Sequence, residues 1–174
     1  MPYSKRDNDA EVLQYVDDHR IDVVLDVGAG AGTYGRLLRD RVTTVDAVEV
    51  WKPYVVEFAL RDLYDTVYTC DVRDERFQAA LLQHGPYDLI IFGDILEHMS
   101  TEDGQRVWAW ARKVARHGLI SVPTVHWPQG AVNGNPFEEH VQDCIGPDDF
   151  GAAFGPFDVT HLYKKTATFF TEFS

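Results

Sequence analysis

The stretch that decides the fold is Val24-Leu25-Asp26-Val27-Gly28-Ala29-Gly30-Ala31-Gly32, where an apolar run contains one acid and then has glycine at every second position. Residues 21–27 have the apolar, β-branched pattern of a buried strand. Glycine has no Cβ, so the turn over residues 28–32 can take unusual backbone dihedrals and let a ligand approach the main chain. A helix expected from Thr33 would offer free N–H groups to an anionic part of that ligand. The segment therefore predicts a ligand site at the end of the first strand.

Segments with strand and helix patterns alternate along the rest of the chain, which predicts an α/β fold with a mostly parallel sheet. After the first strand we expect strands at residues 42–50, 66–70, 87–92, 119–122, 157–164 and 168–173, the last two as an antiparallel hairpin. We expect helices at residues 8–19, 33–40, from Pro53, 75–83, 100–117 and 147–154. Ser100 with Asp103 is typical of a helix start, and Gly118 of a helix end.

The charge of the chain restricts its partners. Its 174 residues include 16 basic and 28 acidic ones, for a formal net charge of −12. DNA and RNA binding requires clustered Lys and Arg, so nucleic acid is disfavoured as a substrate. The basic residues Arg112, Lys113 and Arg116 fall in a segment of mixed charge and indicate a solvated face. The length fits a single domain over residues 1–174.

No apolar run approaches the ~20 residues that a membrane span requires, and the N-terminal residues lead into a polar stretch. We therefore expect a cytoplasmic protein without a membrane partner. Cys70 and Cys144 have no spacing typical of a metal site, so we expect both to be reduced, buried thiols.

A dinucleotide site is the competing interpretation of the glycine-rich turn, because residues 30–35 match the pattern G-x-G-x-x-G. In dinucleotide-binding proteins the first glycine directly follows the strand. Here that register starts at Gly28 and places Thr33 where glycine is required. The register thus disfavours NAD.

Taken with its context, Asp26-x-Gly28-x-Gly30-x-Gly32 resembles the first motif of the class I S-adenosylmethionine-dependent methyltransferases. The resemblance implies a doubly wound α/β fold with a seven-stranded sheet in the order 3-2-1-4-5-7-6. It also implies S-adenosylmethionine as cofactor and S-adenosylhomocysteine as product, with Asp26, Gly28, Gly30 and Gly32 at the cofactor.

Two further stretches resemble later motifs of that family. Glu49 lies 23 residues after Asp26, where the family has an acid that accepts hydrogen bonds from the ribose hydroxyls; Asp46 is a nearby alternative. Cys70-Asp71-Val72-Arg73 resembles the third motif, in which a carboxylate binds the adenine amino group and the next N–H meets a ring nitrogen. These roles fall to Asp71 and Val72, although Asp71 could also be a simple turn or helix cap.

The fourth resemblance is Asp88-Leu89-Ile90-Ile91-Phe92-Gly93-Asp94-Ile95-Leu96-Glu97-His98, a buried strand that leads to a small residue and an acid. In the family this region contacts the sulfonium side of the cofactor, which assigns Asp94 to the cofactor site. Residues 119–123 resemble the fifth strand of the family.

Methyl transfer needs alignment of a nucleophile with the methyl group, and a base only when the nucleophile must lose a proton. The candidate bases are His98 and, in the long loop over residues 123–146, His126, Glu138, Glu139 and His140. Loops of this length in a compact domain are usually functional. A metal site of Asp94, His126, Glu139 and His140 has no helical His/Glu spacing, so we predict no metal ligands.

The sequence therefore predicts an enzyme that transfers a methyl group to an oxygen or nitrogen of a small polar acceptor, such as a sugar or secondary metabolite. A binding module that keeps the fold without catalysis is the main alternative, because fold alone does not establish activity. An NAD-dependent oxidoreductase is the third.

Overall fold

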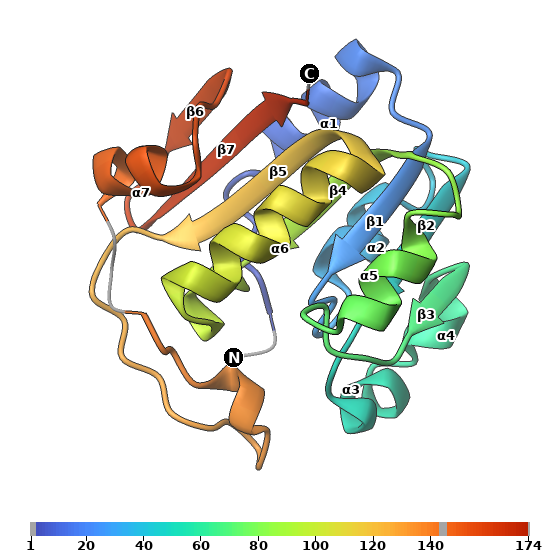
Figure 1. Cartoon of the computed structure of the whole chain (residues 1–174), viewed down its shortest axis with the longest axis horizontal. Coiled ribbons are helices and arrows are strands. Elements are labelled where there is room, and N and C mark those ends of the chain that lie inside the picture. Colours follow the sequence, from blue (N-terminus) through green and yellow to red (C-terminus); the bar gives the residue numbers. More distant parts are fainter. Residues whose placement is uncertain (1–2, 143–145, 174) are drawn as a thin grey trace.

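The computed structural model describes residues 3–142 and 146–173, which form a seven-stranded sheet with helices on both faces (Figure 1). The strand order is β3-β2-β1-β4-β5-β7-β6. Neighbouring strands from β1 to β5 pair in parallel, whereas β7 pairs antiparallel with β5 and β6. The doubly wound α/β fold with a C-terminal hairpin is thus confirmed.

The elements follow one another in alternation along the chain. The strands are β1 (Val23–Val27), β2 (Thr44–Val48), β3 (Thr66–Tyr68), β4 (Tyr87–Gly93), β5 (Ala115–Pro123), β6 (Val159–Leu162) and β7 (Thr166–Glu172). The helices are α1 (Asp9–His19), α2 (Thr33–Leu38), α3 (Lys52–Glu57), α4 (Leu60–Leu63), α5 (Glu75–Leu81), α6 (Thr101–Val114) and α7 (Pro147–Phe154), with 3-10 turns η1 (Leu96–His98) and η2 (Pro136–Glu138).

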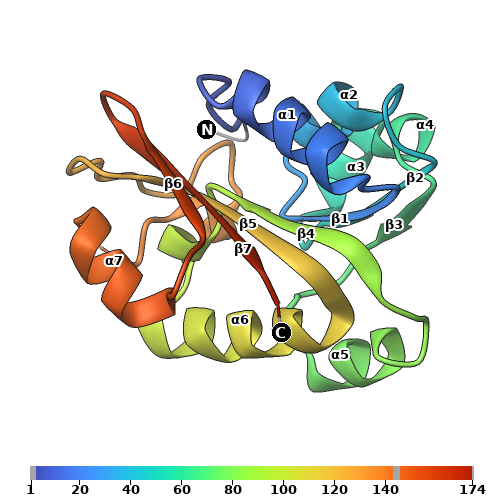
Figure 2. The ribbon, with the colours of Figure 1, turned by 90° about the horizontal axis from the view of Figure 1, so that it is seen from above.

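The sheet has an apolar layer on each face. Along β4, Leu89 and Ile91 contact the layer that includes α1 and α2, whereas Ile90 and Phe92 contact the layer that includes α6. Figure 2 shows α1 and α2 on one face and α5 and α6 on the other. A parallel strand buried on both faces needs apolar residues at successive positions, which explains the uninterrupted apolar run in β4.

The prediction of a helix over residues 100–117 is correct at its start and wrong at its end. The Ser100 hydroxyl caps the helix by accepting a hydrogen bond of 3.1 Å from the Asp103 N–H. However, α6 ends at Val114, and Gly118 lies within β5 instead of stopping a helix. A Cβ on Gly118 would lie 2.4 Å from the Trp108 ring and 2.5 Å from the Phe173 ring. Close packing of these rings, and not a helix terminus, accounts for this glycine.

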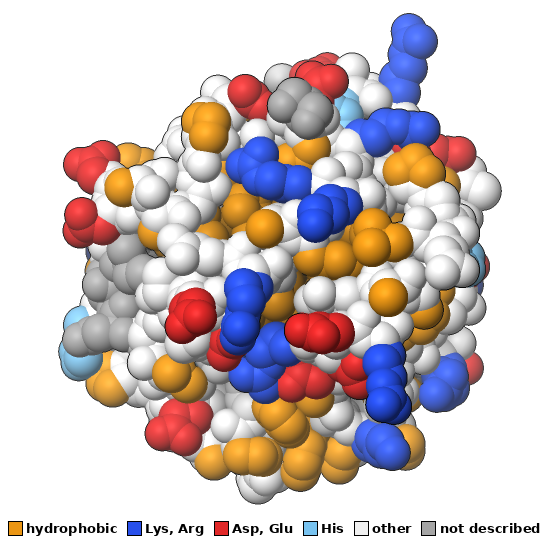
Figure 3. Space-filling model, viewed as in Figure 1, with side chains coloured by type: hydrophobic (Ala, Val, Ile, Leu, Met, Phe, Trp, Pro, Cys, Tyr) orange, Lys and Arg blue, Asp and Glu red, His pale blue; other side chains and the backbone are white. Residues whose placement is uncertain are grey.

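Acidic and basic side chains are both present on the face that α5 and α6 cover (Figure 3). Arg112 lies over the Trp108 and Phe173 rings, and Arg116 forms an ion pair with Asp88. Arg112 and Arg116 are therefore engaged by neighbouring side chains. Within the described ranges, no helix is long and apolar enough to cross a membrane.

Candidate functional site

The larger of two adjoining pockets lies at the carboxyl ends of β1 to β4, where the strand order reverses between β1 and β4. It encloses about 780 Å³, part of it open to solvent. Its walls come from the loops after these strands, from the N-terminal segment and from the long loop. The lining includes Tyr3, Ser4, Gly28, Gly30, Val48, Glu49, Tyr54, Cys70, Asp71, Val72, Arg73, Gly93, Asp94, Ile95, His98, Met99, Asn135, Phe137 and Glu138.

The glycine-rich turn forms one wall of the larger pocket. Gly28, Gly30 and Gly32 have φ values of 75°, 51° and 77°, in the left-handed region that favours glycine. A Cβ on Gly28 would lie 2.4 Å from Ile95 Cδ1, so this position has no room for a side chain. Gly28 and Gly30 line the pocket, and Gly32 does not. The turn thus presents backbone to the pocket, as the glycine pattern predicts.

Glu49 and Asp46, the two candidates for the acid of the second strand, have different positions. Glu49 lines the larger pocket, and its carboxylate accepts hydrogen bonds from the N–H groups of Gly30 at 2.8 Å and Trp51 at 2.7 Å. Asp46 does not line the pocket, and its carboxylate accepts a bond of 2.8 Å from the Tyr87 hydroxyl. Of the two acids, Glu49 is the one that lines the pocket.

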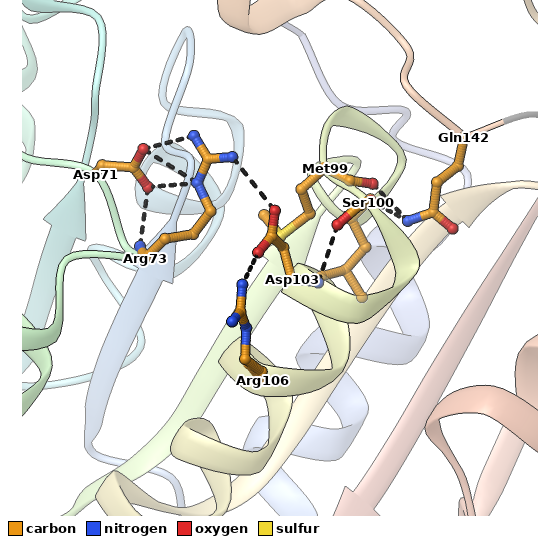
Figure 4. A network of polar contacts seen from close by, with 8 residues as sticks. Asp71, Arg73, Met99, Ser100, Asp103, Arg106 and Gln142 are labelled. Carbon is orange, nitrogen blue, oxygen red and sulfur yellow. Dashed lines mark hydrogen bonds and ion pairs between the residues drawn. The ribbon is translucent and has the colours of Figure 1, made fainter.

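Asp71 and Val72, which follow β3 in the chain, also line the larger pocket. Arg73 holds the Asp71 carboxylate with Nε and Nη2 and also lies 3.8 Å from Asp103 at the start of α6 (Figure 4). Hydrogen bonds and the charge of Arg73 lower the pKa of Asp71 despite partial burial. The lowered pKa favours the Asp71 anion, and Arg73 fixes its orientation through both the guanidinium and the backbone N–H, which donates to Asp71 Oδ1 at 2.9 Å in a local turn.

Asp26 lies beneath the glycine-rich turn and does not line either pocket. Its side chain is 1% exposed and accepts a 2.5 Å hydrogen bond from the Tyr64 hydroxyl. Burial raises the pKa of Asp26 to about 7, and the charge of Glu49 acts in the same direction. The Tyr64 hydroxyl also accepts a bond from the Gly35 N–H, which links Asp26 to α2.

Asp94 lines both pockets and has φ 52°, which is uncommon for a residue with a side chain. Its carboxylate accepts hydrogen bonds from the Lys5 N–H at 3.2 Å and the Ser121 hydroxyl at 3.5 Å. Burial raises the pKa of Asp94 to about 6. Strain at such a position is typical of functional sites.

The smaller pocket adjoins the larger one and encloses about 500 Å³, part of it open. The two pockets share Tyr3, Asp94 and His98. Its other lining residues are polar or aromatic for the most part: Lys5, Glu97, Pro123, Trp127, Gln129, His140 and Thr166. The long loop therefore forms one wall, as its length and composition predict.

Of the predicted bases, some line a pocket and others line neither pocket. His98 and His140 lie together, with ring centroids 4.8 Å apart, and burial lowers the pKa of both. His126 and Glu139 are exposed and line neither pocket. Glu138 is buried in the wall of the larger pocket. The backbone of Glu139 nevertheless contacts His98, because its carbonyl oxygen lies 3.1 Å from His98 Nδ1.

Several lining residues were not expected from the sequence. Glu97 precedes the predicted His98 and could have been found from that adjacency, whereas Tyr3 and Ser4 have no pattern that marks them. Cys70 is half-buried, not buried, and its free thiol lines the larger pocket. Cys144 lies outside the described residues.

Similar proteins of known structure share the fold across nearly the whole chain. A S-adenosylmethionine-dependent methyltransferase from Clostridium acetobutylicum ATCC 824 is 11% identical, with a TM-score of 0.70 over 94% of this chain and 89% of that one. The magnesium protoporphyrin IX methyltransferase of Synechocystis PCC 6803, with bound S-adenosylhomocysteine, is 16% identical, with a TM-score of 0.68 over 97% and 83%. The N-terminal domain of EvdMO1, also with bound S-adenosylhomocysteine, is 11% identical, with a TM-score of 0.68 over 98% and 83%.

The sequence comparisons give one family. No curated protein sequence matches the chain. Residues 24–118 match the model of a family described as a methyltransferase domain, and this range contains the glycine-rich turn, Glu49, Asp71 and Asp94. Because the match spans more than half of the chain, and the sheet has the strand order expected of class I enzymes, the chain belongs to the methyltransferase domain family, with the Rossmann-like fold of S-adenosylmethionine-dependent methyltransferases.

Proposed function

We propose that the chain transfers a methyl group from S-adenosylmethionine, bound in the larger pocket, to an oxygen or nitrogen of a small polar acceptor in the smaller pocket. The observation that carries this proposal is the junction of the two pockets at Asp94 and His98. A cofactor and an acceptor held on either side of this junction could meet in line, which is the main requirement of methyl transfer.

The acidic side chains and the exposed backbone that line the larger pocket suit the binding of S-adenosylmethionine. Each Glu49 oxygen already accepts one backbone N–H, and a carboxylate has about four acceptor sites, so Glu49 keeps capacity for two ribose hydroxyls. Asp71 and the Val72 N–H are assigned to the adenine. Similar structures crystallised with S-adenosylhomocysteine support the choice of cofactor.

The smaller pocket supports a small, polar acceptor. Its Trp127 ring and the nearby histidines can orient a compact polar molecule. In the reaction the bond between the methyl carbon and the sulfonium sulfur breaks as the bond to the acceptor forms. S-adenosylhomocysteine leaves, and the acceptor proton is released on the side where His98 and His140 lie.

The test is transfer of an isotope-labelled methyl group from S-adenosylmethionine to a panel of sugars, phenols and amines, followed by mass spectrometry. We expect one acceptor class to gain the label with matching formation of S-adenosylhomocysteine. Tight cofactor binding with no transfer to any acceptor would favour the alternative, a binding module without catalysis.

A further inference from the structure

We propose that Glu97, His98 and His140 form a binding site for one divalent transition-metal ion at the edge of the smaller pocket. Each residue offers one potential ligand atom, and the three atoms lie within 4.8 Å of one another. Two imidazoles and one carboxylate are a ligand set that Zn²⁺ and related ions prefer, and three protein ligands leave a further position open. This set shares only His140 with the combination weighed from the sequence.

The Glu97 carboxylate is the first reason for the proposal. Its side chain is 8% exposed, and Oε2 has no hydrogen-bond partner among the described residues. A buried carboxylate oxygen without a partner is costly, and proteins usually satisfy such a group with a hydrogen bond, a cation or a metal. A cation between Glu97 and the two histidines would satisfy this oxygen.

The second reason is the state of the two imidazoles. The Glu139 carbonyl can only accept, so the 3.1 Å contact requires the proton on His98 Nδ1 and leaves Nε2 unprotonated in the neutral ring. His140 likewise bonds to the Trp127 backbone through one ring nitrogen. Metal-binding histidines commonly have this arrangement, in which a backbone carbonyl fixes the ring and the other nitrogen binds the ion.

Backbone hydrogen bonds hold the segment of Glu97 and His98 against the segment of His140. The Glu97 carbonyl accepts from the N–H groups of Val141 at 2.9 Å and Gln142 at 3.1 Å. The Gln142 side-chain amide donates to the carbonyls of Leu96 and Met99 (Figure 4). Two segments that lie more than 40 residues apart in the sequence are thus joined on both sides of the proposed site.

A tetrahedral ion with bonds of about 2.1 Å requires its ligand atoms to lie about 3.4 Å apart. Binding would therefore draw the ligand atoms together from 4.8 Å by roughly 1.4 Å. All three residues line the smaller pocket, so a ligand in that pocket can reach the open coordination position. The open position would bind an acceptor oxygen beside the methyl group, an inference that rests on the proposed function.

The test is a calorimetric titration of the full chain with Zn²⁺, after treatment with a chelator and removal of any affinity tag. We expect one Zn²⁺ per chain, and binding at least about 100-fold weaker in Glu97→Gln and in His140→Ala. His126→Ala and Glu139→Gln should bind Zn²⁺ like the native chain, because these side chains lie outside the cluster. Co²⁺ absorption should show nitrogen and oxygen ligands in the native chain and lose that signal in the two ligand variants.

Thermal unfolding without metal shows whether each variant is folded, and His98→Ala replaces any ligand variant that is not. The proposal is overturned by absence of saturable 1:1 binding, or by ligand variants that bind Zn²⁺ as the native chain does. Because the titration uses neither S-adenosylmethionine nor an acceptor, it fails or succeeds independently of the proposed methyl transfer.

Discussion

Replacing His98 or His140 with alanine is expected to lower methyl transfer by about 10²- to 10⁴-fold. Both rings line the smaller pocket, and either removal of the acceptor proton or binding of a metal ion would depend on them. The affinity for S-adenosylhomocysteine should stay within a few-fold of the native value for His140→Ala, since His140 does not line the larger pocket. Single-turnover transfer of a labelled methyl group, with calorimetric titration of S-adenosylhomocysteine, measures both quantities.

His84→Ala is the matched control, because His84 is exposed in the turn after α5 and lines neither pocket. Its turnover should equal that of the native chain. Full turnover of the double variant His98→Ala/His140→Ala between about pH 6 and 9 would show that alignment alone carries the reaction.

The free energy of unfolding is expected to fall as pH rises from about 4 to 7, through the ionisation of Asp26. Burial raises the pKa of Asp26 from 3.8 to about 7, so in this window the folded chain keeps a proton that the unfolded chain has lost. The resulting stabilisation is complete below about pH 4, falls through the window, and is lost above pH 7, a change of up to about 4 kcal/mol. Asp94, with its pKa raised to about 6, acts in the same direction.

Asp26→Asn removes the ionisation and keeps an oxygen that can accept from the Tyr64 hydroxyl. Urea unfolding across pH 4 to 8 should show a flatter curve for this variant, with its largest gain over the native chain above pH 7. In the native chain the hydrogen bond from Tyr64 lowers the pKa of Asp26. Tyr64→Phe removes this bond, so the pH at which the stabilisation is lost should move higher. Parallel curves for Asp26→Asn and the native chain would contradict a buried, titrating Asp26.

Much of the fold could be predicted because its determinants are local or repeat along the chain. The glycine-rich turn needs positive φ at Gly28, Gly30 and Gly32, and only glycine adopts such angles without strain. The buried parallel strands appear as apolar runs that turn residues separate. The Ser100 cap acts over three residues, so the sequence gives its position directly.

The sequence does not reveal positions that distant residues decide. Gly118 has the sequence signature of a helix end, but contacts with Trp108 and Phe173 place it in a strand. Asp26 is the first residue of the motif that contains the glycine-rich turn. The Tyr64 hydroxyl, 38 residues away in the sequence, holds the Asp26 carboxyl beneath that turn. In the long loop, tertiary contacts turn His140 toward η1 and leave His126 and Glu139 exposed. Loop composition alone cannot distinguish these positions.

We expect S-adenosylmethionine to bind in the larger pocket through Glu49 and the glycine-rich turn. The most direct measurement is calorimetric titration of the native chain and Glu49→Gln with S-adenosylhomocysteine, and of the native chain with NAD. Asp46→Asn is the matched control, because Asp46 is a buried acid in β2, just before Glu49, and does not line the pocket.

We expect 1:1 binding of S-adenosylhomocysteine to the native chain and to Asp46→Asn, and no binding of NAD. Glu49→Gln should bind about 10- to 100-fold more weakly, since a carboxylate that accepts hydroxyl bonds contributes about 1.5 to 3 kcal/mol. Binding of NAD without binding of S-adenosylhomocysteine would contradict the cofactor assignment. Loss of binding in Asp46→Asn, with Glu49→Gln unaffected, would contradict the role of Glu49.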